Sequence, residues 1–372
     1  MTDIESAAIA AEDLRAEAEE KAAVAVEGAA RVVEELASIA AGGNEPVTIC
    51  VDADGGDNAP NAVTDGVILA LAEDPALKIV LVGREESISS VAAEFPERIE
   101  PVITTEVIDM ADHPAQAVRR KKDSSIVVGC KLVHEGRARG FFSAGSTGAC
   151  LTAATILIGR IKGVARPALA TIIPSATGPV IFTDIGANSD CKPEYLAQFA
   201  IMGQALGETF LGMKAPTVGL LSNGSEDTKG SDFSQSVHEL MLESVPRFYG
   251  NVEGGDLFKG TCNVVVTDGF TGNVALKVLE GTAGFVFSNL KRIMTASVPN
   301  KLAAATLKGD IKEFKDTIDP DVYGGAPLLG VRGVCVIGHG SSSPEAIKNG
   351  IAACAKSARM RLPERIGEAL AQ

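Results

Sequence analysis

Short apolar runs alternate with longer segments of mixed polarity along the chain from residue 47 onward. The runs have the length and the Val, Ile and Leu content of buried strands, and the segments between them have the length of helices. Core strands are predicted at 47–52, 78–82, 140–143, 180–184, 217–221, 263–267 and 333–337. Helices are predicted near 60–73, 114–135, 147–161, 193–208, 232–245, 271–294 and 343–371. This alternation predicts an α/β fold with a doubly wound, mostly parallel sheet.

The segments outside this rhythm define the expected organisation. Two shorter apolar runs, 101–103 and 169–173, are expected to add edge strands. Residues 46–372 contain no linker or repeat and are expected to form one α/β domain. Residues 1–45 carry 11 acidic and 3 basic side chains and predict an acidic helical extension, either solvated or binding a partner.

Six of the predicted strands end in turns rich in Gly, Asp, Asn and Ser. These turns lie at 52–57, 143–148, 184–188, 222–227, 268–273 and 338–343. If all the strands ran in parallel, the six turns would meet at one edge of the sheet, where ligands bind. Helix N-termini at that edge offer unpaired N–H groups and favour anions, above all phosphate.

The polar residues and glycines of these turns are the candidate ligands for phosphate and substrate. They are Asp52, Gly55, Gly56, Asp57, Ser143, Gly145, Ser146, Thr147, Gly148, Asp184, Asn188, Lys192, Asp268, His339, Gly340, Ser341 and Ser342. An Asp at a strand end can instead cap the next helix, and Lys192, at a helix start before Pro193, can be a solvated side chain. His339, between two glycines, is more typical of a ligand-binding group than of a structural one.

Several classes of site are not indicated. The dinucleotide pattern G-x-G-x-x-G is absent, because Ser343 occupies the third glycine position after Gly338 and Gly340, and no phosphate-binding G-x-x-x-x-G-K-[ST] loop occurs. No zinc-ligand spacing is found, so no metal is expected. The net charge of −14 argues against nucleic-acid binding. The seven scattered cysteines indicate a reducing compartment, with Cys191 the one candidate for a reactive thiol.

Two basic segments could meet other molecules. Residues 285–315 alternate apolar and basic side chains and predict two amphipathic helices divided at Pro299 and Asn300, which could lie on an anionic membrane or pack on the protein or a second subunit. Four consecutive cations at 119–122 could form a solvated helix face or a dock for an acidic protein. We expect a cytoplasmic protein that could touch a membrane surface.

Taken together, the turns resemble one family. The chain is similar, from about residue 47 to its C-terminus, to the bacterial phosphate acyltransferases of phospholipid synthesis (the PlsX family). The resemblance rests on the turns above, in order, together with segments at 117–125, 166–170, 192–194, 266–274 and 323–328. Asp54 replaces the family's usual Met in the first turn, and the 1–45 extension lies outside the resemblance.

The resemblance implies a fold like that of isocitrate and isopropylmalate dehydrogenases and phosphotransacetylase. It also implies a homodimer, and formation of acyl phosphate from acyl-acyl carrier protein and inorganic phosphate without a cofactor. It implies catalytic roles for Lys229 and Asn273. It implies a membrane-contacting protrusion in 285–315, near a membrane glycerol-phosphate acyltransferase, and docking of the carrier protein on the basic run. The residues concerned are, for the membrane, Leu290, Ile293, Met294, Val298 and Leu302 and, for the carrier protein, Arg119, Arg120, Lys121 and Lys122.

Three alternatives remain open at the level of sequence. The chain could transfer acyl groups from acyl-CoA to phosphate, as phosphotransacetylases do. It could be a decarboxylating dehydrogenase of the same architecture, which would need a nicotinamide site and metal-binding aspartates. It could also bind a phosphoryl ligand without catalysing a reaction.

Overall fold

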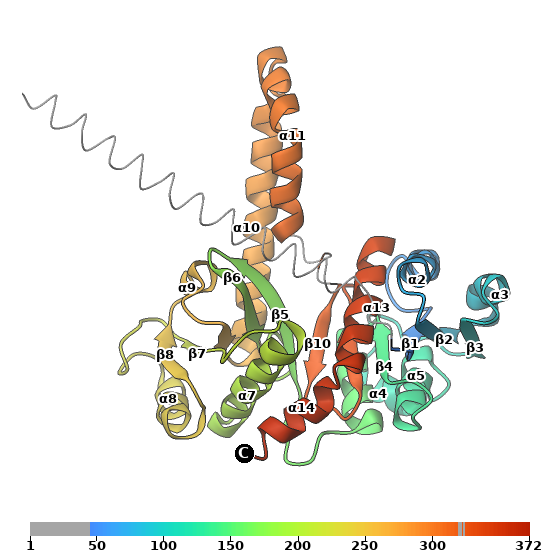
Figure 1. Ribbon diagram of the computed structural model, residues 1–372, viewed down its shortest axis with the longest axis horizontal. Coiled ribbons are helices and arrows are strands. Elements are labelled where there is room, and N and C mark those ends of the chain that lie inside the picture. Colours follow the sequence, from blue (N-terminus) through green and yellow to red (C-terminus); the bar gives the residue numbers. More distant parts are fainter. Residues whose placement is uncertain (1–44, 319–321, 323) are drawn as a thin grey trace, which may run out of the picture.

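A computed structural model describes residues 45–318, 322 and 324–372 as an α/β body from which two long helices project (Figure 1). The extension 1–45 therefore lies outside the described residues apart from Glu45. The strands are β1 (Val47–Asp52), β2 (Leu77–Gly83), β3 (Ile99–Ile103), β4 (Gly140–Ser143), β5 (Ala168–Ser175), β6 (Gly178–Thr183), β7 (Val218–Leu221), β8 (Phe248–Val252), β9 (Val264–Val266), β10 (Ala326–Leu329) and β11 (Val334–Ile337). They form a single sheet of order β3-β2-β1-β4-β11-β10-β5-β6-β9-β7-β8.

Helices cover both faces of this sheet, apart from the two that project from the body (Figure 1). The helices, with the projecting pair α10 and α11 included, are α2 (Asn61–Glu73), α3 (Glu85–Glu94), α4 (Pro114–Arg120), α5 (Ser125–His134), α6 (Thr147–Ala153), the π-helical turn η1 (Ala154–Ile158), α7 (Pro193–Phe210), α8 (Asp232–Ser244), α9 (Asp256–Lys259), α10 (Gly269–Thr295), α11 (Val298–Ile318), α13 (Pro344–Arg359) and α14 (Leu362–Ala369).

Residues of one strand alternate between the two faces of the sheet. Ile49 and Val51 of β1 pack in a core with α2 and α13, whereas Cys50 between them packs in the core on the other face, with α5 and α6. A third core joins the second half of the sheet to α7, α8 and α14. Because the strands are buried on both faces, they appear in the sequence as continuous apolar runs.

The strands are mostly parallel, but their direction reverses in the middle of the sheet. β1, β2, β3, β4 and β11 run one way. β10 is antiparallel to β11 and to β5, and β5 is antiparallel to β6. The strands β6, β7, β8 and β9, parallel to one another, therefore run opposite to the first set. The prediction that all six turns share one edge is wrong.

Other differences from the expected elements are local. The run 169–173 belongs to β5, in the centre of the sheet rather than at an edge, whereas β8 forms the second edge. The helix expected at 114–135 is two helices, because α4 ends at Arg120. The last helix also divides, where Arg361 has φ +56° between α13 and α14.

The projecting helices are continuous with the body. α10 begins two residues after β9 and runs for 27 residues. α11 follows it after another two residues and packs beside it (Figure 1). The two helices divide at Ala296 and Ser297, and Pro299 and Asn300 lie in the first turn of α11 rather than between the helices. Within the described ranges, none of the helices combines the length and apolar character needed to cross a bilayer.

Candidate functional site

The turns after β1, β4 and β11 meet at one edge of the sheet. The Ser143 hydroxyl donates to Asp52 Oδ2 at 2.7 Å, and the Asp57 N–H donates to the Gly340 carbonyl at 2.7 Å. A Cβ on Gly55 would collide with the Asp52 carboxylate and the Gly145 amide, so this close approach requires glycine. Three of the predicted turns therefore form one cluster, which we call the first cluster.

The first cluster is built around a buried carboxylate. Asp52 is 1% exposed, and burial raises the pKa of its carboxyl, against hydrogen bonds from Ser125 and Ser143 that lower it. Asp54, the unusual residue of this turn, points away from the cluster. Its carboxylate accepts from the Arg84 N–H at 2.8 Å and the Ser87 hydroxyl at 2.7 Å, and it pairs with the Arg84 guanidinium. Asp54 thus ties the turn to α3.

Most of the other predicted residues of this cluster belong to the turn after β11 or to the start of α6. Ser146 is the N-cap position of α6, although its side chain makes no cap hydrogen bond, and Thr147 and Gly148 open the helix, with Gly148 packed against Pro114. His339 hydrogen bonds through Nδ1 to the Ser341 hydroxyl at 2.8 Å in an exposed turn, and Ser342 is buried. Gly56 accommodates the Gly340 carbonyl with φ +107°.

The turns after β6 and β9 form a second cluster around Asp184. Its carboxylate accepts hydrogen bonds from the N–H groups of Leu169, Gly186, Ala187 and Asn188, and from the Asn188 side chain, at 2.8–3.1 Å. Burial raises the pKa of Asp184, and these hydrogen bonds partly offset that rise. With its acceptor sites filled by the protein, Asp184 orders the turn.

Asn273 and Lys192 stand beside that turn. Asn273, half-buried in the first turns of α10, packs its amide against Gly186, where a Cβ would lie 2.9 Å from Nδ2. Asp268 caps α10 by accepting from the N–H of Thr271 at 2.9 Å and from its hydroxyl at 2.7 Å. Lys192 is exposed at the N-cap of α7. Of the two roles considered for an Asp at a strand end, ligand binding and helix capping, Asp268 has the capping role.

Lys229 lies in the loop that follows β7. Its ammonium is 3.9 Å from Glu226 Oε1, and both side chains are about half exposed or more, so this pair is weak. Two buried side chains hold the loop. Asn251 donates to the Glu226 carbonyl at 2.8 Å, and Asn251 Oδ1 lies 3.1 Å from Nδ1 of the buried His238. Sequence reasoning missed this anchor, because a buried His–Asn pair has no spacing signal.

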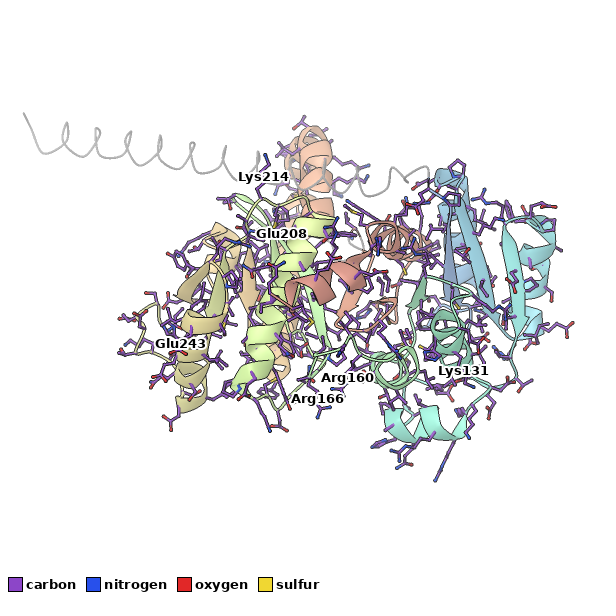
Figure 2. The ribbon with its side chains drawn as sticks, turned by 60° about the horizontal axis from the view of Figure 1, so that its bottom comes forward. Lys131, Arg160, Arg166, Glu208, Lys214 and Glu243 are labelled. Carbon is purple, nitrogen blue, oxygen red and sulfur yellow. The ribbon has the colours of Figure 1, made fainter. Side chains whose placement is uncertain are left out.

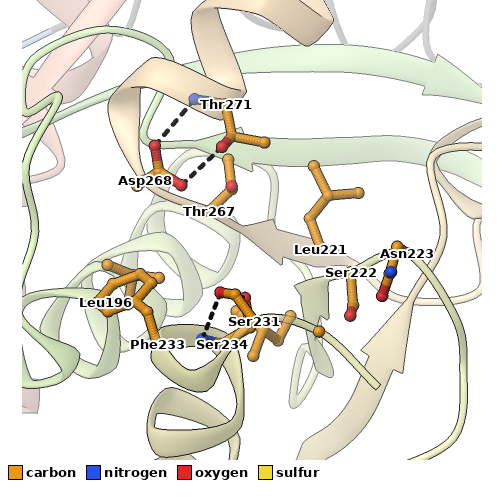
Figure 3. Close-up of a pocket in the computed structure, with 12 residues that line it drawn as sticks. Leu196, Leu221, Ser222, Asn223, Ser231, Phe233, Ser234, Thr267, Asp268 and Thr271 are labelled. Carbon is orange, nitrogen blue, oxygen red and sulfur yellow. Dashed lines mark hydrogen bonds between the residues drawn. The ribbon is translucent and has the colours of Figure 1, made fainter.

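A cavity of about 360 Å³ joins this loop to the start of α10 (Figure 3). Its walls include Ser222, Asn223 and Gly230 from the loop and Asp268 and Thr271 from the turn before Asn273. The loop that carries Lys229 and the helix that carries Asn273 therefore border the same hollow. Sequence reasoning brought Lys229 and Asn273 together only through the family resemblance.

The basic run at 119–122 is not one exposed helical face. Lys121 lies beyond the end of α4 and is held by the protein: its ammonium donates to the Val107 carbonyl and Asp112 Oδ2, each at 2.7 Å. Arg119, Arg120 and Lys122 are exposed. Only three of the four cations therefore face solvent freely enough to meet a partner.

A reactive thiol at Cys191 gains no support. All seven cysteines are free, and Cys191, the only one not buried, has its pKa raised to about 11 by partial burial, so it is a thiol rather than a thiolate at neutral pH. Among the residues that the structure describes, no group of three His, Cys, Asp or Glu side chains could hold a metal ion.

The five residues predicted to contact a membrane lie on the projecting helices. Ile293, Val298 and Leu302 are 55%, 70% and 68% exposed. Leu290 and Met294 are half-buried in the described structure. The exposed three lie around the junction of α10 and α11, at the end distant from the body (Figure 1).

The outer surface of the body carries many other charged side chains, several of them at helix ends and loops (Figure 2). Lys214, labelled there, is exposed in the segment before β7, at the opposite end of the strand from Lys229. It provides a matched reference for the charge of Lys229.

The profile of a protein family described as "Fatty acid synthesis protein" matches residues 47–365. The chain is 44% identical over 324 residues to a phosphate acyltransferase of Brevibacillus brevis, covering 87% of this chain and 97% of that protein. It is 46% identical over 306 residues to a phosphate acyltransferase of Desulfitobacterium hafniense, covering 82% and 91%.

Solved structures share the fold at much lower identity. A phosphotransacetylase from Streptococcus pyogenes aligns with a TM-score of 0.60 at 16% identity, over 88% of this chain and 99% of that one. The EutD phosphotransacetylase from Staphylococcus aureus aligns with a TM-score of 0.56 at 19% identity, over 88% and 99%. With a family profile matched over most of its length and relatives this similar, the chain belongs to the fatty acid synthesis protein family that includes the bacterial phosphate acyltransferases.

Proposed function

We propose that this protein is an acyltransferase that forms acyl phosphate from acyl-acyl carrier protein and inorganic phosphate. The observation that carries the proposal is the 44–46% identity to phosphate acyltransferases over more than four fifths of the chain. The described geometry is compatible with it, because the loop that carries the accessible Lys229 and the helix that carries Asn273 border one cavity. Acyl phosphate made in this way would supply glycerophospholipid synthesis.

The reaction needs little covalent chemistry from the enzyme. A phosphate oxygen attacks the thioester carbonyl, and the carbonyl electron pair moves onto oxygen. When the carbonyl re-forms, the C–S bond breaks, and the carrier thiolate leaves and takes a proton from solvent. Phosphate is already anionic at neutral pH, so the protein's task is to hold two anions together and to stabilise the oxyanion.

Lys229 is assigned to phosphate or to the developing oxyanion, and Asn273 to a hydrogen bond with the same centre. A lysine ammonium serves as a point charge for phosphate, and the loop around Lys229 leaves it without a strong internal partner. Asn188 belongs to the turn after β6 and Lys192 follows it at the start of α7, and both would complete the anion site. The first cluster, on the other strand set, would bind substrate through its glycine turns.

Replacing Lys229 tests this assignment. Loss of one such donor should lower turnover about a hundredfold to a thousandfold. The measurement is acyl phosphate production, trapped as hydroxamate, for wild type, Lys229→Ala and Lys214→Ala. The Lys214 variant removes an equal charge from the other end of β7 and should keep wild-type turnover. Near-normal turnover of Lys229→Ala would remove this residue from the mechanism.

The same hydroxamate assay distinguishes the two candidate acyl donors. Acyl-acyl carrier protein and acyl-CoA with equal chains are compared side by side. A clear preference for acyl-CoA would replace the proposal by phosphotransacetylase-like transfer, and phosphate binding without turnover would leave a non-catalytic binding protein. The exposed Arg119, Arg120 and Lys122 are the proposed dock for the acidic carrier protein, and their combined replacement should raise KM for the carrier substrate alone.

The finer architecture is also part of the proposal. Residues 46–372 would form one domain of the isocitrate and isopropylmalate dehydrogenase type, supported by the phosphotransacetylase fold similarity, with 1–45 as an extension. The protein would act as a homodimer. The helical pair, including 285–315, would form an amphipathic protrusion whose exposed apolar residues touch an anionic membrane, bringing acyl phosphate to a membrane glycerol-phosphate acyltransferase.

A further inference from the structure

The cavity beside Lys229 has walls of two chemical kinds (Figure 3). Leu196, Leu220, Leu221 and Phe233 give it apolar surface from α7, β7 and α8. Ser222, Asn223, Ser231, Ser234 and Thr271 give it hydroxyl and amide groups. A ligand that fills it must therefore offer both alkyl surface and several neutral hydrogen-bonding groups.

One of these polar side chains has a hydroxyl without a partner. The Ser222 Oγ is buried and has no hydrogen-bond partner among the described residues. A buried hydroxyl without a partner costs stability, and that cost would fall if the side chain turned to bond a ligand group in the cavity. By contrast, the Ser231 hydroxyl already accepts the Ser234 N–H as the cap of α8, and Asp268 already caps α10.

The charge of the cavity walls disfavours the binding of an anion. None of the twelve lining residues is cationic, and the one ionisable side chain is the Asp268 carboxylate. Inorganic phosphate in this cavity would face a negative charge with no opposing lysine or arginine. A fatty acyl chain is also a poor match, because it would remove water from the polar side chains of the wall without replacing their hydrogen bonds.

We propose that this cavity binds the pantetheine arm that carries the acyl thioester. The inference rests on the proposed function. Pantetheine is neutral, with two amides and a hydroxyl for the polar wall and a gem-dimethyl group for the apolar wall. The cavity adjoins Gly230, next to Lys229, and Thr271, two residues before Asn273. An arm seated there brings its thioester end to these two side chains.

The test combines a filled cavity with a shortened arm. Ser234→Leu places a branched side chain in the cavity, and Ser236→Leu, exposed on the same helix outside the cavity, is the control. The substrates are acyl-pantetheine and acyl-N-acetylcysteamine with the same acyl chain, because the second lacks the pantoyl half. Ser234→Leu should raise KM for acyl-pantetheine about tenfold or more and leave the short thioester unchanged. Ser236→Leu should change neither.

An equal loss with both thioesters that grows with acyl-chain length would assign the cavity to the acyl chain and overturn the proposal. Asn223→Ala provides a second test in case Ser234→Leu misfolds, because Asn223 is an exposed residue of the cavity wall. This variant should raise KM for acyl-pantetheine by about threefold to tenfold.

Calorimetric titration with pantetheine itself separates this inference from the proposed function. Wild type that binds pantetheine, with Ser234→Leu weakened, supports the cavity assignment even if no acyl phosphate forms. Turnover by wild type together with equal pantetheine binding by both proteins would retain the proposed function and reject the cavity assignment.

Discussion

Asp52 and Asp184 end their strands as buried carboxylates that hold the following turn in place. Asp52 accepts from the Asp54 N–H and the Ser143 hydroxyl, and Asp184 accepts from a series of backbone N–H groups. Burial raises the pKa of both carboxyls, and the hydrogen bonds act in the opposite direction. These two residues therefore serve any ligand mainly through the backbone that they order.

The raised pKa of Asp52 gives stability a pH dependence. The folded protein binds this proton more tightly than the unfolded chain, so this group's contribution to stability is full below the unfolded pKa and is lost as pH rises through the folded pKa. In Asp52→Asn the group is always neutral, and the amide can still accept from Asp54 and donate to Ser143. Urea unfolding should show the free energy of unfolding of the variant, relative to wild type, improving from about pH 4 to about pH 7.

A difference that stays constant with pH would contradict this account of Asp52. Asp57→Asn, a matched substitution at an exposed side chain of the same turn, controls for a general effect of removing a carboxylate.

At the scale of elements, α10 begins in unusually close contact with the end of β6. The Gly269 N–H donates to the Asn188 carbonyl at 2.8 Å, and a Cβ on Gly272 would collide with the Asp184 carbonyl. Because that obstacle is backbone, it has little freedom to move. The glycines of this helix start thus let Asn273 reach the turn at Gly186.

Two glycines of the same helix should respond in opposite directions to alanine. Gly272→Ala should lower the free energy of unfolding by about 1–3 kcal/mol, because of the collision with Asp184. Gly281→Ala, where the added Cβ meets nothing within 4 Å, should raise it by about 0.5–1 kcal/mol through helix propensity. Thermal and urea unfolding of both variants measure this, and a destabilised Gly281→Ala would show that α10 needs flexibility there.

Membrane contact by the projecting pair of helices can be tested separately. Val298 is 70% exposed near the junction of α10 and α11. If this end lies on a membrane, Val298→Glu should reduce binding to anionic vesicles, because it replaces apolar contact by a charge repelled from the surface. Vesicle flotation measures this, with Ser236→Glu on the body as the control. Equal binding by both variants would exclude this contact.

At the scale of the whole molecule, sequence patterns predicted most strands but not their directions. The runs 169–173 and 180–184 are separated by six residues, too few for the crossover that parallel neighbours need. Their antiparallel pairing in β5 and β6 was therefore readable from loop length. β10 escaped notice because it is short and lies among glycines, and without it the reversal of the second strand set could not be inferred.

The candidate site was predictable to the same degree. Glycines and carboxylates at strand ends identified the residues of both clusters, although as parts of one site, because a strand end in an α/β sheet has a recognisable composition. Their division between two strand sets depends on β10 and β5, and the cavity depends on how α7, α8 and α10 pack. Contacts of that kind join distant segments and leave no local pattern.

The two last strands of the chain lie in the middle of the sheet, with β11 beside β4 and β10 beside β5. After them, α13 packs on α2 and α14 packs on α7. During synthesis on the ribosome, each half can collapse as it emerges, but the halves have no shared sheet until the final segment arrives. A nascent chain lacking that segment would expose the unpaired edges of β4 and β5, and such edges invite aggregation. Synthesis of the C-terminal segment is thus the step that allows the two halves to form one continuous sheet.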